Sequence, residues 1–148
     1  MDSITKHDIR ALLALRYRNA RIYTLDRDYS LVDCKLIDKA DSQFTWQMRL
    51  VGLHRWVAEK LDCDKWAWLF KAYVTIRNAL SKREFAIPIG ILCYHVNGDR
   101  SKGHMINSYL HYDERCGKMS IQEIEPQPNN GAVNLTPKER DSAWLVVY

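Results

Sequence analysis

Apolar residues recur at helical spacing in the first part of the chain. A first helix is predicted from Thr5 to about Arg18, because Thr5 and Asp8 resemble a capping box and apolar side chains follow three and four residues apart, at Ile9, Leu12, Leu13 and Tyr17. A short extended stretch, Arg21 to Leu25, comes next. The segment Asp26 to Ser42 mixes turn-forming and apolar residues, and we interpret it as an ordered loop.

Two more helices are expected before the middle of the chain. One runs from about Phe44 to Lys60, and its apolar side consists of Trp46, Leu50, Leu53 or His54, and Val57. The other begins at Asp62, a good N-cap residue, and continues to Ser81. Its apolar stripe is wide, which predicts a central and largely buried helix; the stripe comprises Trp66, Leu69, Phe70, Tyr73, Ile76 and Leu80.

The hydrophobic period changes from helix to strand after Phe85. Strands are predicted at 87–96, 104–112, 118–125 and 143–148, with turn-forming residues between them at 97–103, 113–117 and 126–131. Helices followed by consecutive strands indicate an α+β fold, with N-terminal helices packed on a C-terminal antiparallel sheet. The length of 148 residues fits a single domain, residues 1–148. The last strand offers an edge for another subunit, and the oligomeric state stays open.

Composition and charge exclude several classes of protein. The chain is 47% hydrophobic and 27% charged, which is typical of a globular domain, and no apolar run is long enough to span a membrane. The net charge of +4 is spread along the chain, so nucleic-acid binding is less favoured. Its 4 cysteines are too few for a disulfide scaffold and the N-terminus lacks a secretion signal, so we expect a cytoplasmic protein with free thiols.

Cys63 is the cysteine with a candidate chemical role. It falls in the first turn of the third predicted helix, where the helix dipole and unpaired backbone N–H groups favour a thiolate. The neighbouring Asp62 and Asp64 act in the opposite direction, because negative charge raises the pKa of a thiol. The alternative is a buried cysteine that only packs, since free cysteine is among the most buried residue types.

A histidine and a carboxylate follow on two predicted neighbouring strands. His104 opens one strand and Glu125 closes the next, and a hairpin turning within 113–117 brings them opposite each other. A cysteine at a helix start, a strand-borne histidine and an orienting carboxylate together form a thiol nucleophile with its base. Taken singly, His104 is also an ordinary exposed strand start and Glu125 an ordinary strand end.

These residues lie in three short motifs that resemble a known family. The motifs are Asp62-Cys63-Asp64-Lys65-Trp66-Ala67, then Gly103-His104-Met105-Ile106-Asn107, then Ile124-Glu125-Pro126-Gln127. They resemble those of papain-like and transglutaminase-like cysteine-hydrolase domains, found in small phage and bacterial proteins and in the C-terminal protease domain of a mushroom ring agglutinin. The resemblance covers most of the chain and implies a papain-like fold, with the cysteine helix packed against an antiparallel sheet.

The resemblance also implies roles for individual residues. Cys63 would be the nucleophile, His104 the general base and Glu125 the orienting carboxylate. Glu123 is a less favoured alternative acid, because it lies on the same face of its strand but outside the motif. A Ca²⁺ ion is a further implied component.

Asp62 and Asp64 are the candidate oxygen ligands for such a cation. Their plain interpretation is a helix cap and a first-turn charge. The chain departs from the family in having no glutamine shortly before Cys63 to hold an oxyanion. Trp56 or Arg55 could supply a donor instead.

Two further groups of residues have structural interpretations. A zinc site is disfavoured, because no paired-ligand motif is present among Cys93, His95, His104, His111 and Cys116. The aromatic residues at helical spacing are expected in the core, with Trp68 as the best candidate for an exposed contact; the group comprises Trp46, Trp56, Trp66, Trp68, Phe70 and Tyr73.

The sequence therefore leads to three hypotheses about function. The first is a cysteine hydrolase or acyl-transfer enzyme that acts on a peptide-like amide bond of a peptide or protein through Cys63, His104 and Glu125. The second is a catalytically inactive member of the same fold that serves as an interaction protein, in the host cytoplasm if it is phage-encoded. The third and least favoured is a nucleic-acid-binding protein.

Overall fold

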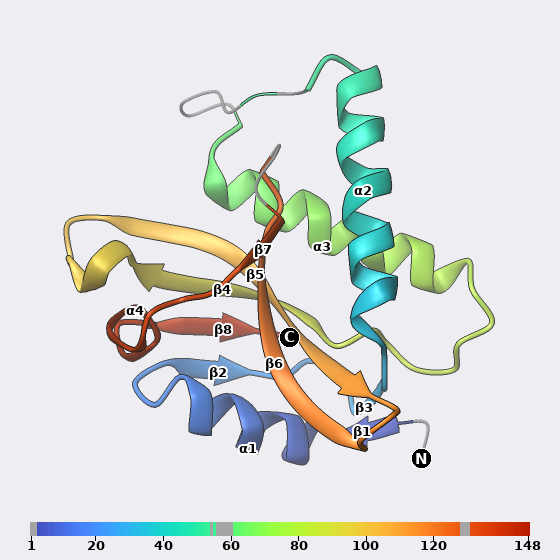
Figure 1. Cartoon of the computed structure of the whole chain (residues 1–148), viewed down its shortest axis with the longest axis horizontal. Coiled ribbons are helices and arrows are strands. Elements are labelled where there is room, and N and C mark those ends of the chain that lie inside the picture. Colours follow the sequence, from blue (N-terminus) through green and yellow to red (C-terminus); the bar gives the residue numbers. More distant parts are fainter. Residues whose placement is uncertain (1–2, 54, 56–60, 128–130) are drawn as a thin grey trace.

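The computed structural model describes residues 3–53, 55, 61–127 and 131–148 (Figure 1). The elements follow in this order: β1 (Ser3–Thr5), α1 (Lys6–Arg16), β2 (Arg21–Tyr23), β3 (Asp28–Ser30), α2 (Cys34–Leu50), α3 (Cys63–Ala79), β4 (Ile89–His95), a 3-10 turn η1 (Val96–Gly98), β5 (Gly103–Asp113), β6 (Lys118–Glu125), β7 (Gly131–Val133), α4 (Pro137–Asp141) and β8 (Leu145–Val147). The α+β class and the predicted first helix and strands are confirmed.

The main sheet is mixed, which corrects the prediction of an antiparallel sheet. Its strand order is β2-β8-β4-β5-β6-β7, and β1 and β3 form a separate pair. β2 runs parallel to β8, with Ile22 opposite Val146. A strand from the first part of the chain thus joins the sheet beside the last strand. On its other side β8 pairs with β4. Both edges of β8 are therefore occupied, and the expectation that it offers a free edge to another subunit is wrong.

The two faces of the sheet carry different helices. Leu92 of β4 and Ile106 of β5 pack on one face in a cluster that includes Ile9 and Leu13 of α1. The next residues along the same strands point the other way, as strand alternation requires. On that second face, Ile89, Tyr109 and Ile124 pack with buried side chains of α2 and α3, among them Ile37, Phe44, Trp66 and Phe70. The sheet is thus a middle layer between α1 and the pair α2 and α3.

The helix α2 begins where a loop was predicted. Asp33 starts it, and its side-chain oxygen accepts a hydrogen bond from the backbone N–H of Lys35 at 2.8 Å. Ile37, Ala40 and Phe44 then recur at helical spacing and are buried against α3. The interpretation of 26–42 as a loop is therefore wrong, because the segment contains β3 and the first half of α2.

The helix predicted for Phe44 to Lys60 is also wrong in its extent and its buried side. α2 ends at Leu50, and Gly52 follows with a positive φ of 79° that suits a helix end. Trp46 is 60% exposed and Leu50 is 65% exposed, so neither belongs to the core. His54 and Trp56–Lys60 lie outside the described residues.

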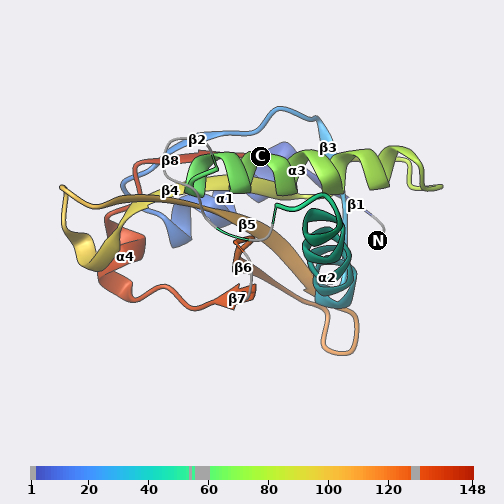
Figure 2. The ribbon, with the colours of Figure 1, turned by 90° about the horizontal axis from the view of Figure 1, so that it is seen from above.

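The third predicted helix is confirmed as α3, and its buried stripe is confirmed in part. Trp66 and Phe70 are fully buried, whereas Ile76 and Leu80 are largely exposed near the C-terminal end. Figure 2, seen from above, shows α3 lengthwise and α2 almost end-on, so α2 crosses α3 and covers only part of it. Trp68 is half exposed, as predicted. Among the described helices none is long and apolar enough to cross a membrane.

Candidate functional site

The structure brings His104 and Glu125 together. In the β5–β6 ladder Asp113 is opposite Lys118 and Asn107 is opposite Ile124, so His104 lies beyond the last pair instead of directly opposite Glu125. The side chains nevertheless meet on the diagonal, where His104 Nε2 and Glu125 Oε2 are 2.5 Å apart. Diagonal neighbours on a sheet are within reach of long side chains. The predicted hydrogen-bonded pair is present, with a register two residues away from the expected one.

The surroundings of this pair hold the imidazole in one orientation. Glu125 is 5% exposed, and its second oxygen accepts a hydrogen bond from the backbone N–H of Gln127 at 3.3 Å. The ring of Tyr94 packs edge-on against the His104 ring, with centroids 5.7 Å apart. When the Nε2–H donates to the carboxylate, Nδ1 is the nitrogen that can accept a proton. No residue in the described part of the chain hydrogen-bonds Nδ1.

Cys63 lies at the predicted place but is not joined to the other two residues. It is the first residue of α3 and is half-buried, and Asp62 occupies the N-cap without a side-chain cap bond. The helix start therefore keeps backbone N–H groups that a side-chain cap would otherwise use. Within the described ranges, no hydrogen bond connects Cys63 to His104 or Glu125.

Tyr94 is near both Cys63 and the His104–Glu125 pair, and sequence reasoning missed it. Burial raises the pKa of Tyr94, and the nearby Glu139, Glu125 and Cys63 raise it further. Its neighbour Cys93 points to the α3 side of the sheet, where burial and then the nearby Cys63 raise the pKa of the Cys93 thiol to about 11. Cys63 thus approaches from the α3 side, whereas His104 pairs with Tyr94 on the side of α1. The strand register of Tyr94 opposite His104 is the signal that identifies it.

The carboxylates beside Cys63 already have a cationic partner. Lys65 Nζ lies 2.7 Å from Asp62 Oδ1 and 3.5 Å from Asp64 Oδ1. The hydrogen bond to Asp62 raises the pKa of Lys65. The ammonium of Lys65 therefore stands where the resemblance placed a Ca²⁺ ion, and it partly offsets the negative charge next to the thiol.

The cysteines and histidines considered for zinc do not form one site. His111 instead meets Asp33 and Cys34, where one possible ligand atom from each lies within 4.8 Å of the others. His111 Nδ1 accepts the backbone N–H of Cys34 at 3.1 Å, so its lone pair is engaged. This is the arrangement of a helix-start hydrogen-bond network, and it carries no metal assignment.

The remaining predicted and missed residues have structural roles. Arg55, offered as an oxyanion donor, is exposed, and Trp56 lies outside the described residues. Asn107 was quoted in a motif without a role; its buried Nδ2 donates to the backbone oxygens of Ala67 and Gly90, which ties α3 to the sheet. The buried polar position in a strand is the signal for such a tie.

Glu123, the alternative acid, does not contact His104. Its carboxylate accepts hydrogen bonds from Arg16 Nε at 2.7 Å and Nη2 at 2.8 Å. Tyr17 donates its hydroxyl to the same carboxylate at 2.7 Å. All of these partners come from the end of α1, so Glu123 fastens that helix to the sheet.

The arrangement defines a class of fold that solved structures also contain: a mixed sheet between α1 and the crossed helices α2 and α3. One such structure is a "PSL1a-E64 complex", 24% identical, with a TM-score of 0.70 over 99% of this chain and 50% of that chain. Another is a Polyporus squamosus lectin bound to a human-type influenza-binding epitope, Neu5Aca2-6Galb1-4GlcNAc, 21% identical, with a TM-score of 0.73 over 99% of this chain and 49% of that chain. No family model matches the chain, and neither does any curated protein.

These neighbours correct the family resemblance drawn from the motifs. The resemblance pointed to papain-like or transglutaminase-like cysteine hydrolases, whereas the similar solved structures are chains of a mushroom lectin. The assignment to that family, and with it the description as protease-like or as a hydrolase, is therefore wrong. The chain spans about half the length of these lectin chains, and the identities below 25% establish the fold alone.

Proposed function

We propose that this domain is a thiol-dependent acyl-transfer enzyme that acts on peptide-like amide bonds. Cys63 is the nucleophile, His104 the general base and Glu125 the group that orients the imidazole. The observation that carries the proposal is the 2.5 Å contact between His104 Nε2 and Glu125, which leaves Nδ1 as the proton-accepting nitrogen. The position of Cys63 at a helix start supports it, because such a position favours a thiolate.

The proposed reaction has two halves. His104 Nδ1 takes the proton of Cys63, and the sulfur attacks the amide carbon; the C–N bond then breaks, and His104 returns the proton to the leaving amine. The resulting thioester is attacked by an acceptor amine, whose proton passes to His104; the C–S bond breaks, and His104 returns this proton to the released sulfur of Cys63. Glu125 stabilises the imidazolium that forms in each half.

The unliganded geometry requires Cys63 and His104 to come closer when substrate binds. Catalytic hydrogen bonds are often long in unliganded sites and tighten in the complex. Cys63 is the first residue of α3, and its side chain makes no hydrogen bond to another described side chain. Because Cys63 lies on the α3 side of the sheet and His104 on the α1 side, a change of the Cys63 rotamer is not sufficient, and the start of α3 must also move toward the first residues of β5.

The proposal is tested by the rate at which iodoacetamide alkylates each thiol at pH 6. Cys63 should react faster than the exposed Cys116 and the half-buried Cys34, as followed by peptide mass spectrometry. His104→Ala should lower the alkylation rate of Cys63 by roughly 10²-fold, which is the smallest contribution typical of a proton-transfer group. His111→Ala is the matched control, because His111 lies on the same strand, and it should leave the Cys63 rate unchanged.

A Cys63 that reacts no faster than Cys34, or that reacts equally in His104→Ala, contradicts the proposal. A second test uses E64, the compound named with one of the similar structures. The intact mass of the protein after incubation with E64 is compared between the natural chain and Cys63→Ser. A Cys63-dependent adduct supports the proposal.

A non-catalytic interaction protein is the second candidate. It is favoured by the lack of a hydrogen bond from Cys63 to His104 within the described residues, and by the carbohydrate bound to one similar lectin chain. Calorimetric titration with Neu5Aca2-6Galb1-4GlcNAc tests a glycan-binding form of this candidate. Saturable heat together with an unreactive Cys63 would favour it over the enzyme.

A cytoplasmic location belongs to the same proposal. All cysteines of the described residues are free, and a thiol nucleophile needs a compartment that keeps it reduced. Trapping the thiols in intact cells with a maleimide, before lysis, measures their redox state. Fully reduced Cys63 supports the location, and a mixed disulfide at Cys63 contradicts it.

A further inference from the structure

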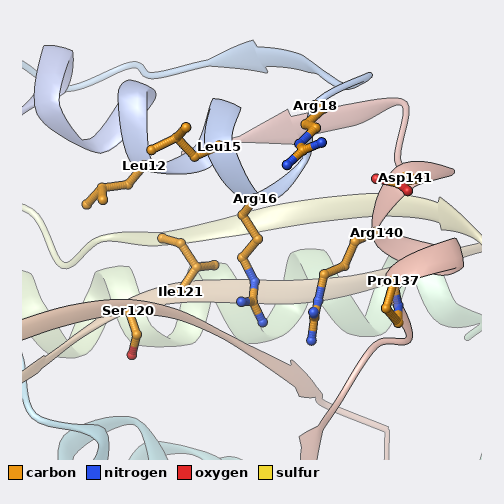
Figure 3. Close-up of a pocket in the computed structure, with 9 residues that line it drawn as sticks. All are labelled: Leu12, Leu15, Arg16, Arg18, Ser120, Ile121, Pro137, Arg140 and Asp141. Atoms are coloured by element: carbon orange, nitrogen blue, oxygen red, sulfur yellow. The ribbon is translucent and has the colours of Figure 1, made fainter.

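A pocket whose lining contains 3 arginines lies between α1, β6 and α4 (Figure 3), and none of Cys63, His104 and Glu125 belongs to that lining. Its volume is about 550 Å³. Apolar side chains form one part of the wall and charged side chains the other; together they are Leu12, Leu15, Arg16, Arg18, Ser120, Ile121, Pro137, Arg140 and Asp141. The pocket thus combines a cationic side with an apolar side.

The arginines differ in whether their charge is already balanced. Arg16 is committed to Glu123 through two hydrogen bonds. Arg140 and Arg18 make no ion pair within the described ranges, and Asp141 is the single acidic residue of the lining. Because Glu123 neutralises Arg16, Arg140 and Arg18 outweigh Asp141 and the pocket keeps a net positive charge.

Among the arginines that line the pocket, Arg140 gives the strongest indication of a ligand. Its Nε is buried and has no hydrogen-bond partner among the described residues. A buried donor without an acceptor is costly and therefore rare in folded proteins. In Figure 3 the side chains of Arg16 and Arg140 extend in the same direction, and the guanidinium of Arg18 lies apart from both. A guanidinium binds an oxyanion through paired N–H groups; Arg16 already has such a partner in Glu123, whereas Arg140 makes no ion pair with any described residue.

We infer that this pocket binds a small organic anion, whose carboxylate or phosphate group is held by Arg140. The apolar part of the ligand lies on Leu12, Leu15 and Ile121. A small ligand fits better than a nucleic acid, because the arginines line a single pocket and do not form a stripe along the surface. The site is distinct from that of the proposed acyl-transfer chemistry, since its lining includes none of Cys63, His104 and Glu125.

Isothermal titration with three probes tests the inference: inorganic phosphate, phenyl phosphate and benzoate, each in sodium chloride of matched ionic strength. We expect saturable binding of phenyl phosphate, benzoate or both, and binding roughly tenfold tighter for phenyl phosphate than for inorganic phosphate, because the ring covers apolar surface. The two ring-bearing probes distinguish a phosphate ligand from a carboxylate ligand, and saturation by either supports the site.

Arg140→Met is the decisive variant, because methionine keeps much of the side-chain length and removes the unpartnered donor. It should fold with an unchanged or higher thermal midpoint and bind the probes at least about tenfold more weakly. Arg10→Met is the matched control; Arg10 is an exposed arginine on α1 outside this pocket, so its loss should leave affinity within about twofold. Binding no stronger than that of chloride, equal binding by Arg140→Met, or equal losses in both variants would overturn the inference.

Discussion

Glu123 and Glu125 are two carboxylates on the same face of β6, two residues apart, and both are buried. Glu123 is bound by a guanidinium and a phenol, Arg16 and Tyr17, neither of which exchanges protons near neutral pH. Glu125 is bound by an imidazole, that of His104, the kind of side chain that serves most often as a general acid or base in enzymes.

The difference shows that the partner, and not the carboxylate, decides the role of each residue. The guanidinium of Arg16 stays charged, and the bond to Glu123 raises its pKa further. Burial, and then Glu123, raises the pKa of Tyr17. This cluster therefore holds α1 on the sheet, whereas the His104–Glu125 pair is the one to which we assign proton transfer in the proposed reaction.

Removing Glu123 should have the largest effect on stability. Glu123→Gln leaves the half-buried Arg16 without its counter-charge, and breaking a buried ion pair in this way costs roughly 3–5 kcal/mol. Urea denaturation measures the loss. Glu125→Gln is the internal control, with an expected loss of about 1 kcal/mol. Equal losses in the two variants would contradict the separation of a structural from a chemical carboxylate.

Glu125→Gln should instead affect the reactivity of Cys63. A neutral amide stabilises an imidazolium less than a carboxylate does, so the alkylation rate of Cys63 at pH 6 should fall about 10- to 100-fold. Glu123→Gln, compared at a temperature where both variants are folded, should leave this rate within about threefold of the natural protein. The opposite ranking of the two variants would make Glu123 the functional acid.

Tyr17→Phe tests how much of the Glu123 cluster depends on the phenol. It removes one hydrogen bond to a charged acceptor, while both bonds from Arg16 remain. We expect a loss of about 1.5 kcal/mol in the free energy of unfolding, measured by urea denaturation. A loss as large as that of Glu123→Gln would show that the phenol, and not the guanidinium, holds the carboxylate.

Asp41 is a third carboxylate, and within the described part of the chain it has neither kind of partner. Burial, and then the nearby Asp38, raises its pKa to about 6 from 3.8. The folded state therefore holds more protons than the unfolded state between these values, and stability falls as the pH rises through that range. Asp41→Asn should raise the thermal midpoint by about 1–2 °C at pH 7.5, and the gain should vanish near pH 4. A gain that persists at pH 4 would contradict this origin.

The sequence was most informative where structure depends on neighbours along the chain. The β5–β6 hairpin and the meeting of His104 with Glu125 follow from strand alternation and a turn at 113–117, both local signals. The first half of α2 was missed because its cap, Asp33, introduces a stretch rich in Lys and Asp, and the buried side of the helix is limited to Ile37, Ala40 and Phe44. The large apolar residues Trp46 and Leu50 led to the prediction of a buried helix face that is in fact exposed, because α3 does not cover it.

Long-range partners could not be predicted in the same way. Glu123 is bound by residues of α1 that lie more than 100 positions earlier in the chain. The arginine pocket joins residues of α1 and α4 across a similar distance. No local sequence pattern predicts such contacts, because they depend on which strand each helix packs against. The approach of Cys63 from the side of the sheet opposite Tyr94 likewise depends on the placement of α3.

The parallel pairing of β2 with β8 has a consequence for the order in which the domain assembles. During synthesis β2 emerges early, yet its single neighbour in the sheet, β8, follows about 120 residues later. The β4–β5–β6 hairpins need only short loop closures and can form first, so β8 must enter between existing elements as the closing strand. Gly90 makes that entry possible, because a Cβ at this position would lie 2.2 Å from the ring of Tyr148. The docking of the C-terminal strand thus depends on the absence of a side chain at Gly90 in β4.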